Sequence, residues 1–452
     1  MKRKSIAVIL AAVLTLSLMG CGAKQEAAQP AAEETTETAE EAPAAEAPAA
    51  DASADGNTLT VWCWDPAFNI YAMEQAAEVY KEKNPDFVLN VVETPWADIQ
   101  TKLTTAATSS DLSSLPDIML LQDNAFQKNV ISYPDAFTDI SSSGIAFDQF
   151  GAAKLAYSTV GGKNYGVPFD NGAVISCVRT DVLEKAGYTV DDFTDITWDE
   201  FIAKGKVVLE KTGKPLLSNQ AGSPDLLMLM MQSAGAWVLD ENGKPDFVDN
   251  AVLKEVVDTY VELVDTGVLV EVNDWDQYVS SINSSTVAGA MNGCWIIGTI
   301  TSAQDQSGLW GVTNIPKLNA EGATNYSNQG GSSWLVCKNS KNPEVVEDFL
   351  ASTFAGSTEL YETILPSSGA LATYLPAGES EAYAQPQEFF GGDAIYSKIT
   401  KYASNVPQVS YGVYNYEARD AIGAAITKIV AGADYDTAIS DAQTETEFQV
   451  GQ

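Results

Sequence analysis

Residues 57–64 read NTLTVWCW and residues 87–94 read FVLNVVET, and a helical pattern over 68–83 separates these two apolar runs. A second helical pattern over 97–110 leads to a third apolar run, PDIMLLQ at 116–122. Strands that alternate with helices at this spacing are typical of βαβ units, in which the strands pair in parallel and helices cover both faces of the sheet. This stretch therefore predicts an α/β fold.

Aromatic and polar residues follow the end of each predicted strand. Trp64 and Asp65 follow the first strand, Trp96 the second and Gln122–Asn124 the third. Open α/β sheets bind ligands at the carboxyl ends of their strands, so these residues are candidates for a binding site. Trp62 lies two residues earlier on the same face as Trp64, and we expect it to pack in the core.

The first 21 residues resemble a bacterial lipoprotein signal. Three basic residues at positions 2–4 precede the apolar run SIAVILAAVLTLSLMG, which is short for a membrane span. LMGC at 18–21 matches the lipobox, in which the cysteine is lipidated and becomes the new N-terminus. We expect residues 1–20 to be removed and Cys21 to carry the membrane anchor. An ordinary cleaved signal with an incidental cysteine is the alternative.

Residues 21–57 consist mainly of Ala, Glu, Thr and Pro, a composition that cannot bury a core. This segment predicts a disordered, acidic tether between the membrane and a folded body. Without residues 1–20 the chain has 22 Lys and Arg against 61 Asp and Glu, a net charge of −39. Such a charge disfavours nucleic acid and anionic lipid as partners and favours a neutral or cationic ligand.

The chain contains no histidine. Ser-His-Asp and Cys-His nucleophiles and His-ligated zinc are therefore excluded, whereas catalysis by carboxylates alone stays open. Besides Cys21, the cysteines Cys63, Cys177, Cys294 and Cys337 lie far apart without C-x-x-C spacing. This pattern favours buried free thiols over disulfides and predicts neither a metal site nor a cofactor.

The later part of the chain predicts a second α/β unit. Strand-like runs cover 173–179, 286–291, 308–317 and 330–340, and helical patterns cover 180–187, 197–213, 224–237, 250–267 and 276–284. Thr197 and Glu200 occupy the two positions of a capping box at a helix start. The 452 residues are enough for two domains, and the C-terminal part is helical and rich in tyrosine.

Seven segments in sequence order carry a more specific resemblance. They are TVWCWD, LPDIMLLQ, GKNYGVPFDNG, TWDEF, VAGAMNGCW, GVTNIPK and GGSSWLVCKNSKNPEVVEDFL. With the lipobox before them, the chain resembles the extracellular solute-binding lipoproteins of carbohydrate ABC importers, the maltose-binding-protein-like family. The resemblance implies two α/β lobes that close on a sugar about a hinge of three crossings.

Carried onto this sequence, the resemblance divides the body into two lobes. The first comprises 58–168 and 314–358, and the second comprises 169–313 and 359–452. The crossings are expected near 168–172, at Pro316 and at 354–363.

The resemblance also implies ligand-binding residues, with rings that stack on sugar faces and polar groups that bind hydroxyls. The matching positions are Trp64, Asp65, Trp96, Gln122, Asp123, Asn124, Asp170, Asn171, Trp237, Trp295, Gly330 and Gly331. The role of Trp334 is open, because two serines separate it from the glycine pair. Two roles stay open for the tyrosines of the C-terminal part, Tyr411, Tyr414 and Tyr416: they line the cleft, or they pack beneath the last helices. We expect Trp198 to pack at a helix start.

The predicted function is that of the substrate-binding component of an ABC transporter. It captures a mono- or oligosaccharide and delivers it to membrane permease subunits, as a monomer that is held outside the cytoplasm by its lipid. One alternative is a carboxylate-dependent glycosidase or lyase that uses Asp65, Asp123 and Asp170. Another is a peptide-binding receptor or adhesin with the same two lobes.

Overall fold

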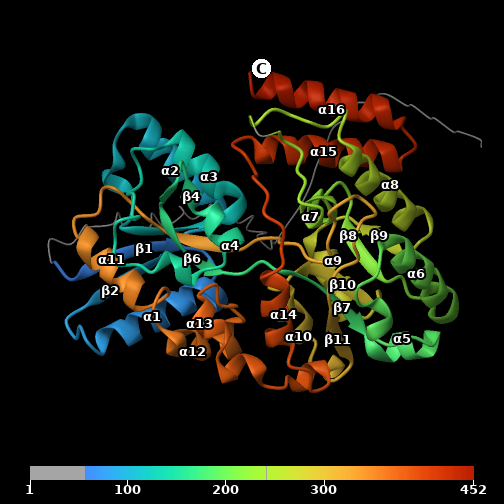
Figure 1. The fold of residues 1–452 in the computed structure, drawn as a ribbon, viewed down its shortest axis with the longest axis horizontal. Coiled ribbons are helices and arrows are strands. Elements are labelled where there is room, and N and C mark those ends of the chain that lie inside the picture. The colour runs from blue at the N-terminus through green and yellow to red at the C-terminus, as the bar shows by residue number, and fades with distance from the viewer. Residues whose placement is uncertain (1–55, 241, 452) are drawn as a thin grey trace, which may run out of the picture. The chain divides into compact units, whose positions relative to one another are not determined.

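The computed structural model describes residues 56–240 and 242–451 (Figure 1). The signal, Cys21 and nearly all of the predicted tether lie outside the described residues, so these expectations stay predictions. In the described ranges, no helix has both the length and the apolar character that crossing a membrane requires.

A five-stranded sheet with the order β2-β1-β3-β12-β6 forms the centre of the first lobe. Its strands are β1 (Thr58–Cys63), β2 (Val88–Glu93), β3 (Ile118–Gln122), β6 (Gly166–Asp170) and β12 (Ser332–Val336). β1 pairs in parallel with β2 and β3, which confirms the βαβαβ prediction. β12 comes from far along the chain and pairs antiparallel with both β3 and β6, so the sheet is mixed.

Helices cover both faces of this sheet because β1 alternates its side chains. Leu59, Val61 and Cys63 pack with α1 (Tyr71–Lys81), α11 (Pro343–Ser352) and α12 (Thr358–Ser368). Trp62 points the other way and packs with α2 (Trp96–Ser109) and α3 (Asp123–Ser132). Trp62 is 5% exposed, as expected for a core residue.

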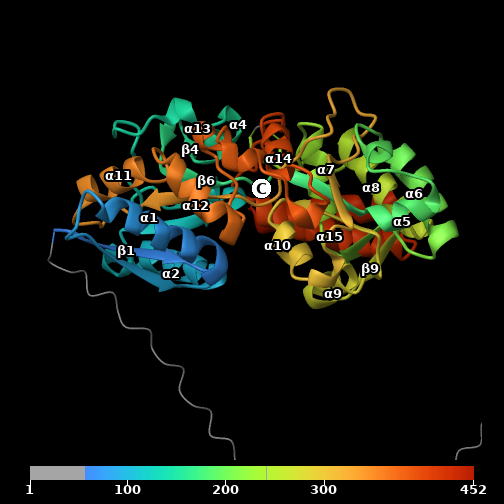
Figure 2. The ribbon, with the colours of Figure 1, turned by 90° about the horizontal axis from the view of Figure 1, so that it is seen from below.

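The second lobe is built on the antiparallel sheet β10-β7-β11 and the parallel pair β8-β9. These strands are β7 (Val174–Arg179), β8 (Leu217–Gln220), β9 (Leu269–Val272), β10 (Gly289–Gly293) and β11 (Trp310–Thr313). The helices that belong to it are α5 (Thr180–Ala186), α6 (Trp198–Thr212), α7 (Asp225–Ser233), α8 (Ala251–Asp265), α9 (Trp275–Asn283), α10 (Ile296–Thr301), α14 (Ile395–Ala403), α15 (Asn415–Val430) and α16 (Tyr435–Gln449). Figure 1 labels these elements on the side opposite β1, α1 and α2, and in Figure 2 the helices α5 to α9 lie on that same side.

Local signals in this lobe act as the sequence predicts. Thr197 and Glu200 form the capping box at the start of α6, and Gly187 ends α5 in a left-handed conformation. Trp198, the first residue of α6, is 2% exposed and packs against the ring of Phe201. Short elements complete the body: α4 (Ala152–Tyr157), the hairpin β4 (Thr159–Val160) and β5 (Lys163–Asn164), and α13 (Leu375–Gly378).

Two of the three crossings lie later in the chain than expected. The first joins β6 to β7 near residues 170–173, as expected. After β11 the chain does not leave at Pro316, because Lys317 and Asn325 bond to the carbonyl of Ile196 in the second lobe. It returns to the first lobe only at 329–331, directly before β12.

The third crossing is also displaced. The predicted boundary at 358 coincides with the start of α12, but α12 packs against α1 and thus belongs to the first lobe. α13 contacts α12, whereas α14 contacts β7 of the second lobe. The crossing therefore falls between 378 and 395. The resemblance placed these two crossings at Pro316 and at 354–363, but packing with distant elements decides where the chain leaves a lobe.

Candidate ligand-binding site

A cavity of about 790 Å³ lies where the carboxyl ends of β1 and β3 meet the starts of α2 and α10 and the crossing at 329–331. It is lined by Trp64, Asp65, Phe68, Asn69, Trp96, Gln122, Asn124, Asp170, Asp225, Trp275, Trp295, Gly298, Thr299, Gln329, Gly330, Gly331, Ser332, Tyr416 and Arg419. Nine of the twelve predicted ligand-binding residues are among them. Both lobes contribute, so the cavity is where a ligand would contact each of them.

Two tryptophans of the first lobe form one aromatic wall. Trp64 and Trp96 meet edge to face, with ring centroids 5.4 Å apart and an angle of 61° between the planes. Asn69, which is 1% exposed, accepts hydrogen bonds from the backbone N–H groups of Trp64 and Asp65, each 3.0 Å long. This buried amide fixes the turn after β1 and holds the first indole at the cavity.

Two tryptophans of the second lobe form another aromatic wall. The centroids of Trp275 and Trp295 are 6.0 Å apart. The indole N–H of Trp295 donates to the carbonyl of Gln329 at 3.0 Å, so this ring is fixed to the backbone of a crossing. Trp275 is 42% exposed, and its ring packs against Tyr278. Apolar rings at the edges of a cavity are suited to flat, partly apolar ligands.

Polar groups converge between these walls. The hydroxyl of Tyr416 donates to Oδ1 of Asn124 at 3.0 Å, and the centroid of its ring lies 5.9 Å from Nζ of Lys128 and 6.0 Å from Cζ of Arg419. The guanidinium of Arg419 forms an ion pair with Asp225. The described lining residues include three carboxylates, of Asp65, Asp170 and Asp225, and one arginine. The cavity favours ligands with hydroxyl groups over anions.

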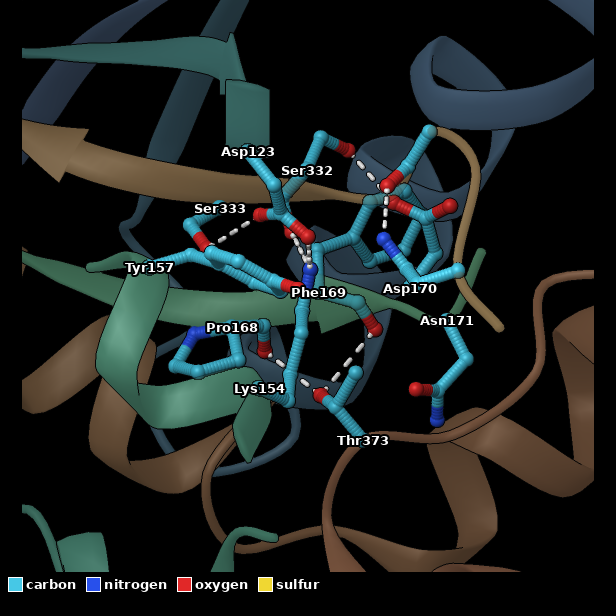
Figure 3. A network of polar contacts seen from close by, with 12 residues as sticks. Asp123, Lys154, Tyr157, Pro168, Phe169, Asp170, Asn171, Ser332, Ser333 and Thr373 are labelled. Carbon is cyan, nitrogen blue, oxygen red and sulfur yellow. Dashed lines mark hydrogen bonds and ion pairs between the residues drawn. The ribbon is translucent and has the colours of Figure 1, made fainter. Parts of the chain in front are cut away.

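A buried ionic network adjoins the cavity and shares Asp170 and Ser332 with its lining. Figure 3 shows the polar contacts of this network. Nζ of Lys154 pairs with Oδ2 of Asp123 at 2.5 Å and donates to the carbonyl of Ser332 at 3.0 Å. The hydroxyl of Ser332 donates to Oδ1 of Asp170, which is 4% exposed. Lys154 thus pairs directly with Asp123, whereas it reaches Asp170 through Ser332 and through its charge.

Burial dominates the ionisation of both acids in this network. It raises the pKa of Asp123 to about 7, although Lys154 opposes the rise, and the nearby Asp170 adds to it. Burial likewise raises the pKa of Asp170, against the effects of Lys154 and Ser332. The pair holds its protons at higher pH than exposed carboxyl groups do.

Comparison with known proteins identifies the class. The sequence model of the bacterial extracellular solute-binding proteins matches residues 75–391. A lactose-binding protein from Rhizobium radiobacter is 37% identical over 398 residues, which cover 88% of this chain and 94% of that protein. The chain belongs to the bacterial extracellular solute-binding protein family. This confirms the family expected from the sequence, and membership of an extracellular family means that the protein acts outside the cytoplasm.

Two further relatives of this solute-binding protein are more distant. An arabinooligosaccharide-binding protein from Bacillus subtilis (strain 168) is 23% identical over 369 residues, 79% of this chain and 77% of that protein. The solved structure of the galacto-N-biose/lacto-N-biose I-binding protein of an ABC transporter from Bifidobacterium longum, in complex with lacto-N-biose, matches with a TM-score of 0.70 at 22% identity. That match covers 88% of this chain and 99% of the other, and it confirms the two-lobe α/β fold.

Three predicted ligand residues of the solute-binding protein do not line the cavity. Asp123 is 1% exposed because its carboxylate forms the ion pair with Lys154 in the buried network. The side chain of Asn171 donates to the carbonyl of Ala372 on the far side of the first crossing. The indole N–H of Trp237 donates to Asn415, and its ring packs against Tyr411.

The residues left open in the sequence divide between core and cavity. Trp334 is fully buried and packs against Phe169 and Phe354. Tyr411 is buried and stacks on Tyr157, whereas Tyr416 lines the cavity. The four cysteines of the body are free and buried, as favoured from the sequence. Among the described residues, no group of three or more acidic or cysteine side chains is placed to hold a metal ion.

Sequence reasoning missed Trp275, Asp225 and Arg419. Trp275 begins α9 three residues after β9 ends, and Asp274 caps this helix. The rule that selected Trp64, a ring just beyond a strand end, would have found it if β9 had been recognised as a strand. No local signal marks Asp225 and Arg419 as partners, because 194 residues separate them.

Proposed function

We propose that this protein captures a neutral disaccharide of the lactose class between its lobes and delivers it to the permease of an ABC importer. The observation that carries the proposal is the cavity itself, in which one tryptophan pair from each lobe faces a set of hydroxyl-binding side chains. The relative that is 37% identical over most of both chains is a lactose-binding protein.

The chemistry of the lining supports a sugar. A pyranose has an apolar C–H face and a rim of hydroxyls, so it requires flat rings together with acceptors and donors. Trp64 and Trp295 supply rings from opposite lobes, and Asp65 and Asp170 supply charged acceptors. A hydrogen bond to a charged group contributes about 1.5–3 kcal/mol, roughly twice a neutral one. We propose that the carboxylates bind hydroxyls and do not cleave glycosidic bonds.

The crossings support closure of the lobes about the ligand. Gly330 and Gly331 have φ angles of +83° and +84°, a conformation that other residues rarely adopt. Gly172 of the first crossing accepts a backbone hydrogen bond from Gln329, and a Cβ on it would lie 2.6 Å from the Gln329 carbonyl oxygen. Two crossings thus pack backbone to backbone, which suits a compact hinge.

Calorimetric titration of the purified chain tests this function. The panel contains lactose, other β-galactosides, arabino-oligosaccharides and glucose disaccharides, and the sugars are recovered afterwards and analysed by chromatography. We expect saturable binding of lactose with intact recovery. Release of galactose and glucose would establish the glycosidase alternative, and binding of peptides but no sugar would establish the receptor alternative.

We also propose that Cys21 carries the lipid anchor, that residues 22–57 act as a tether, and that the protein works as a monomer. The LMGC segment and the acidic composition support the first two points. Metabolic labelling with an alkyne-bearing fatty acid tests the anchor, with Cys21→Ser as the control. Label on the wild-type chain and none on the variant is the expected result, and equal labelling of both would refute it.

A further inference from the structure

A smaller side chamber within the second lobe adjoins the main cavity. Asp225, Trp275 and Gln329 line both spaces and thus form the junction between them. The chamber measures about 20 Å³. One water molecule needs roughly 10–15 Å³ by this measure, so the chamber accepts one or two atoms and not a second sugar ring.

The lining of the chamber is part apolar and part polar. Leu226, Leu229 and Met291 supply the apolar part, and Ser218, Asn219 and Asn292 supply polar groups. All of these positions come from β8, α7 and β10, so they are held by the core of the second lobe.

One polar atom of a residue that lines both spaces lacks a partner. Oε1 of Gln329 is buried and accepts no hydrogen bond from any described residue. A buried acceptor without a donor costs free energy that a bound hydroxyl would recover. A hydroxyl meets this need in either orientation of the amide, since it can both donate and accept.

Resting on the proposed function, we infer that the side chamber binds the hydroxymethyl group of one hexose ring and selects for a free primary hydroxyl there. A hydroxymethyl group is one methylene and one hydroxyl, which fits a chamber of this size and mixed lining. Ring hydroxyls attach directly to the ring and extend less far from it. An acetamido group has more atoms than the chamber holds.

The charge at the junction adds a second criterion. Asp225 is already paired with Arg419, and Asp170 is another carboxylate of the same cavity. A uronic acid, in which the hydroxymethyl is oxidised to a carboxylate, would add a fourth carboxylate to a cavity that has Asp65, Asp170 and Asp225 and whose one arginine is already paired with Asp225. The chamber therefore rejects hexuronic acids and 6-O-substituted sugars at this ring and accepts hexoses.

The test is a calorimetric series on the full chain with lactose and analogues altered at one primary carbon at a time. The analogues are 6-deoxy, uronic acid and 6-O-methyl forms of each ring. We expect all three changes on one ring to lower the affinity about tenfold or more, and the 6-deoxy change on the other ring to lower it less than twofold. Equal affinities for lactose and both 6-deoxy analogues would overturn the inference while the proposed function stands.

A variant assigns the effect to the chamber. Gln329→Ala keeps the backbone contacts of residue 329. With this variant, we expect the 6-deoxy analogue of the critical ring to bind less than threefold more weakly than lactose. Gln122→Ala is the matched control, because Gln122 lines the main cavity but not the chamber. With Gln122→Ala, we expect the same 6-deoxy analogue still to bind about tenfold more weakly than lactose. If the cost persists in Gln329→Ala, the inference is refuted, and if no disaccharide binds at all, both the inference and the proposed function fail.

Discussion

Trp295 offers the sharpest test of the binding site, because its ring has two separable roles. The ring lines the cavity, and the indole N–H donates to the carbonyl of Gln329 in the second crossing. Replacement by alanine removes both, whereas Trp295→Phe keeps a smaller aromatic ring and removes the hydrogen bond. The two variants therefore separate stacking on the ligand from support of the crossing.

The magnitudes follow from the contacts. Burial of an aromatic side chain is worth about 1.5–3 kcal/mol, and the lower half applies because Trp295 is already partly buried without a ligand. We expect Trp295→Ala to weaken lactose binding roughly 10- to 40-fold. The hydrogen bond exists in the free protein, so Trp295→Phe lowers the free energy of unfolding by about 1 kcal/mol and weakens binding less than fivefold.

Calorimetry supplies the dissociation constants and denaturant titration the free energies of unfolding. Trp275→Ala is the matched control, since its ring lines the same cavity and its indole N–H makes no hydrogen bond to a described residue. It is expected to lose affinity with little loss of stability. An unchanged dissociation constant for Trp295→Ala would refute the site. Equal losses of affinity in the Phe and Ala variants would show that the bond to the crossing matters and the ring does not.

Three further predictions concern the buried groups. The folded pKa of Asp123, about 7, exceeds that of an unfolded aspartate, so its stabilising contribution is present below pH 4 and is lost as the pH rises to 7. Denaturant titrations measure the difference in free energy of unfolding between the wild type and Asp123→Asn. This difference should fall by at least about 1 kcal/mol between pH 4 and pH 7, and a difference that does not depend on pH would contradict the raised pKa. Gly331→Ala should lower the free energy of unfolding by at least about 2 kcal/mol, because φ is +84° and a Cβ would lie 2.6 Å from Oδ2 of Asp123; Gly161→Ala, with a φ of +57° and open space, is the control and should lose less. Burial raises the pKa of the four body thiols. With Cys21 blocked, an aromatic disulfide reagent should therefore modify fewer than one thiol per native chain and four thiols per chain in denaturant. Rapid labelling of the native chain would show that these thiols are accessible.

Local patterns in the sequence were sufficient for much of the fold. The βαβαβ unit at 57–122 appears with its predicted parallel pairing, because alternating apolar runs of this length can be buried only in a covered sheet. The side-chain period of a strand separated Trp62, which packs in the core, from Trp64, which reaches the cavity. The capping box at Thr197 is likewise a contact between residues three apart.

Contacts between distant residues were beyond these patterns. The side chain of Asp123 turns toward Lys154, 31 positions away, although its place at a strand end matched that of its cavity-lining neighbours. β12 joins the first sheet only after all the strands of the second lobe have passed along the chain, and it brings Ser332 to Lys154 and Asp170.

The sequence by itself determined the class of fold and three of the four tryptophans that line the cavity, and it predicts an anchor at Cys21, because each of these depends on residues that are neighbours along the chain. Only the tertiary structure decided where the crossings lie, that Asp123 and Trp237 turn away from the cavity, and that Trp275 and Arg419 belong to it. Those outcomes depend on which distant side chains satisfy each buried charge and fill each space between the elements. Residues that are neighbours along the chain do not indicate which of these distant contacts will form.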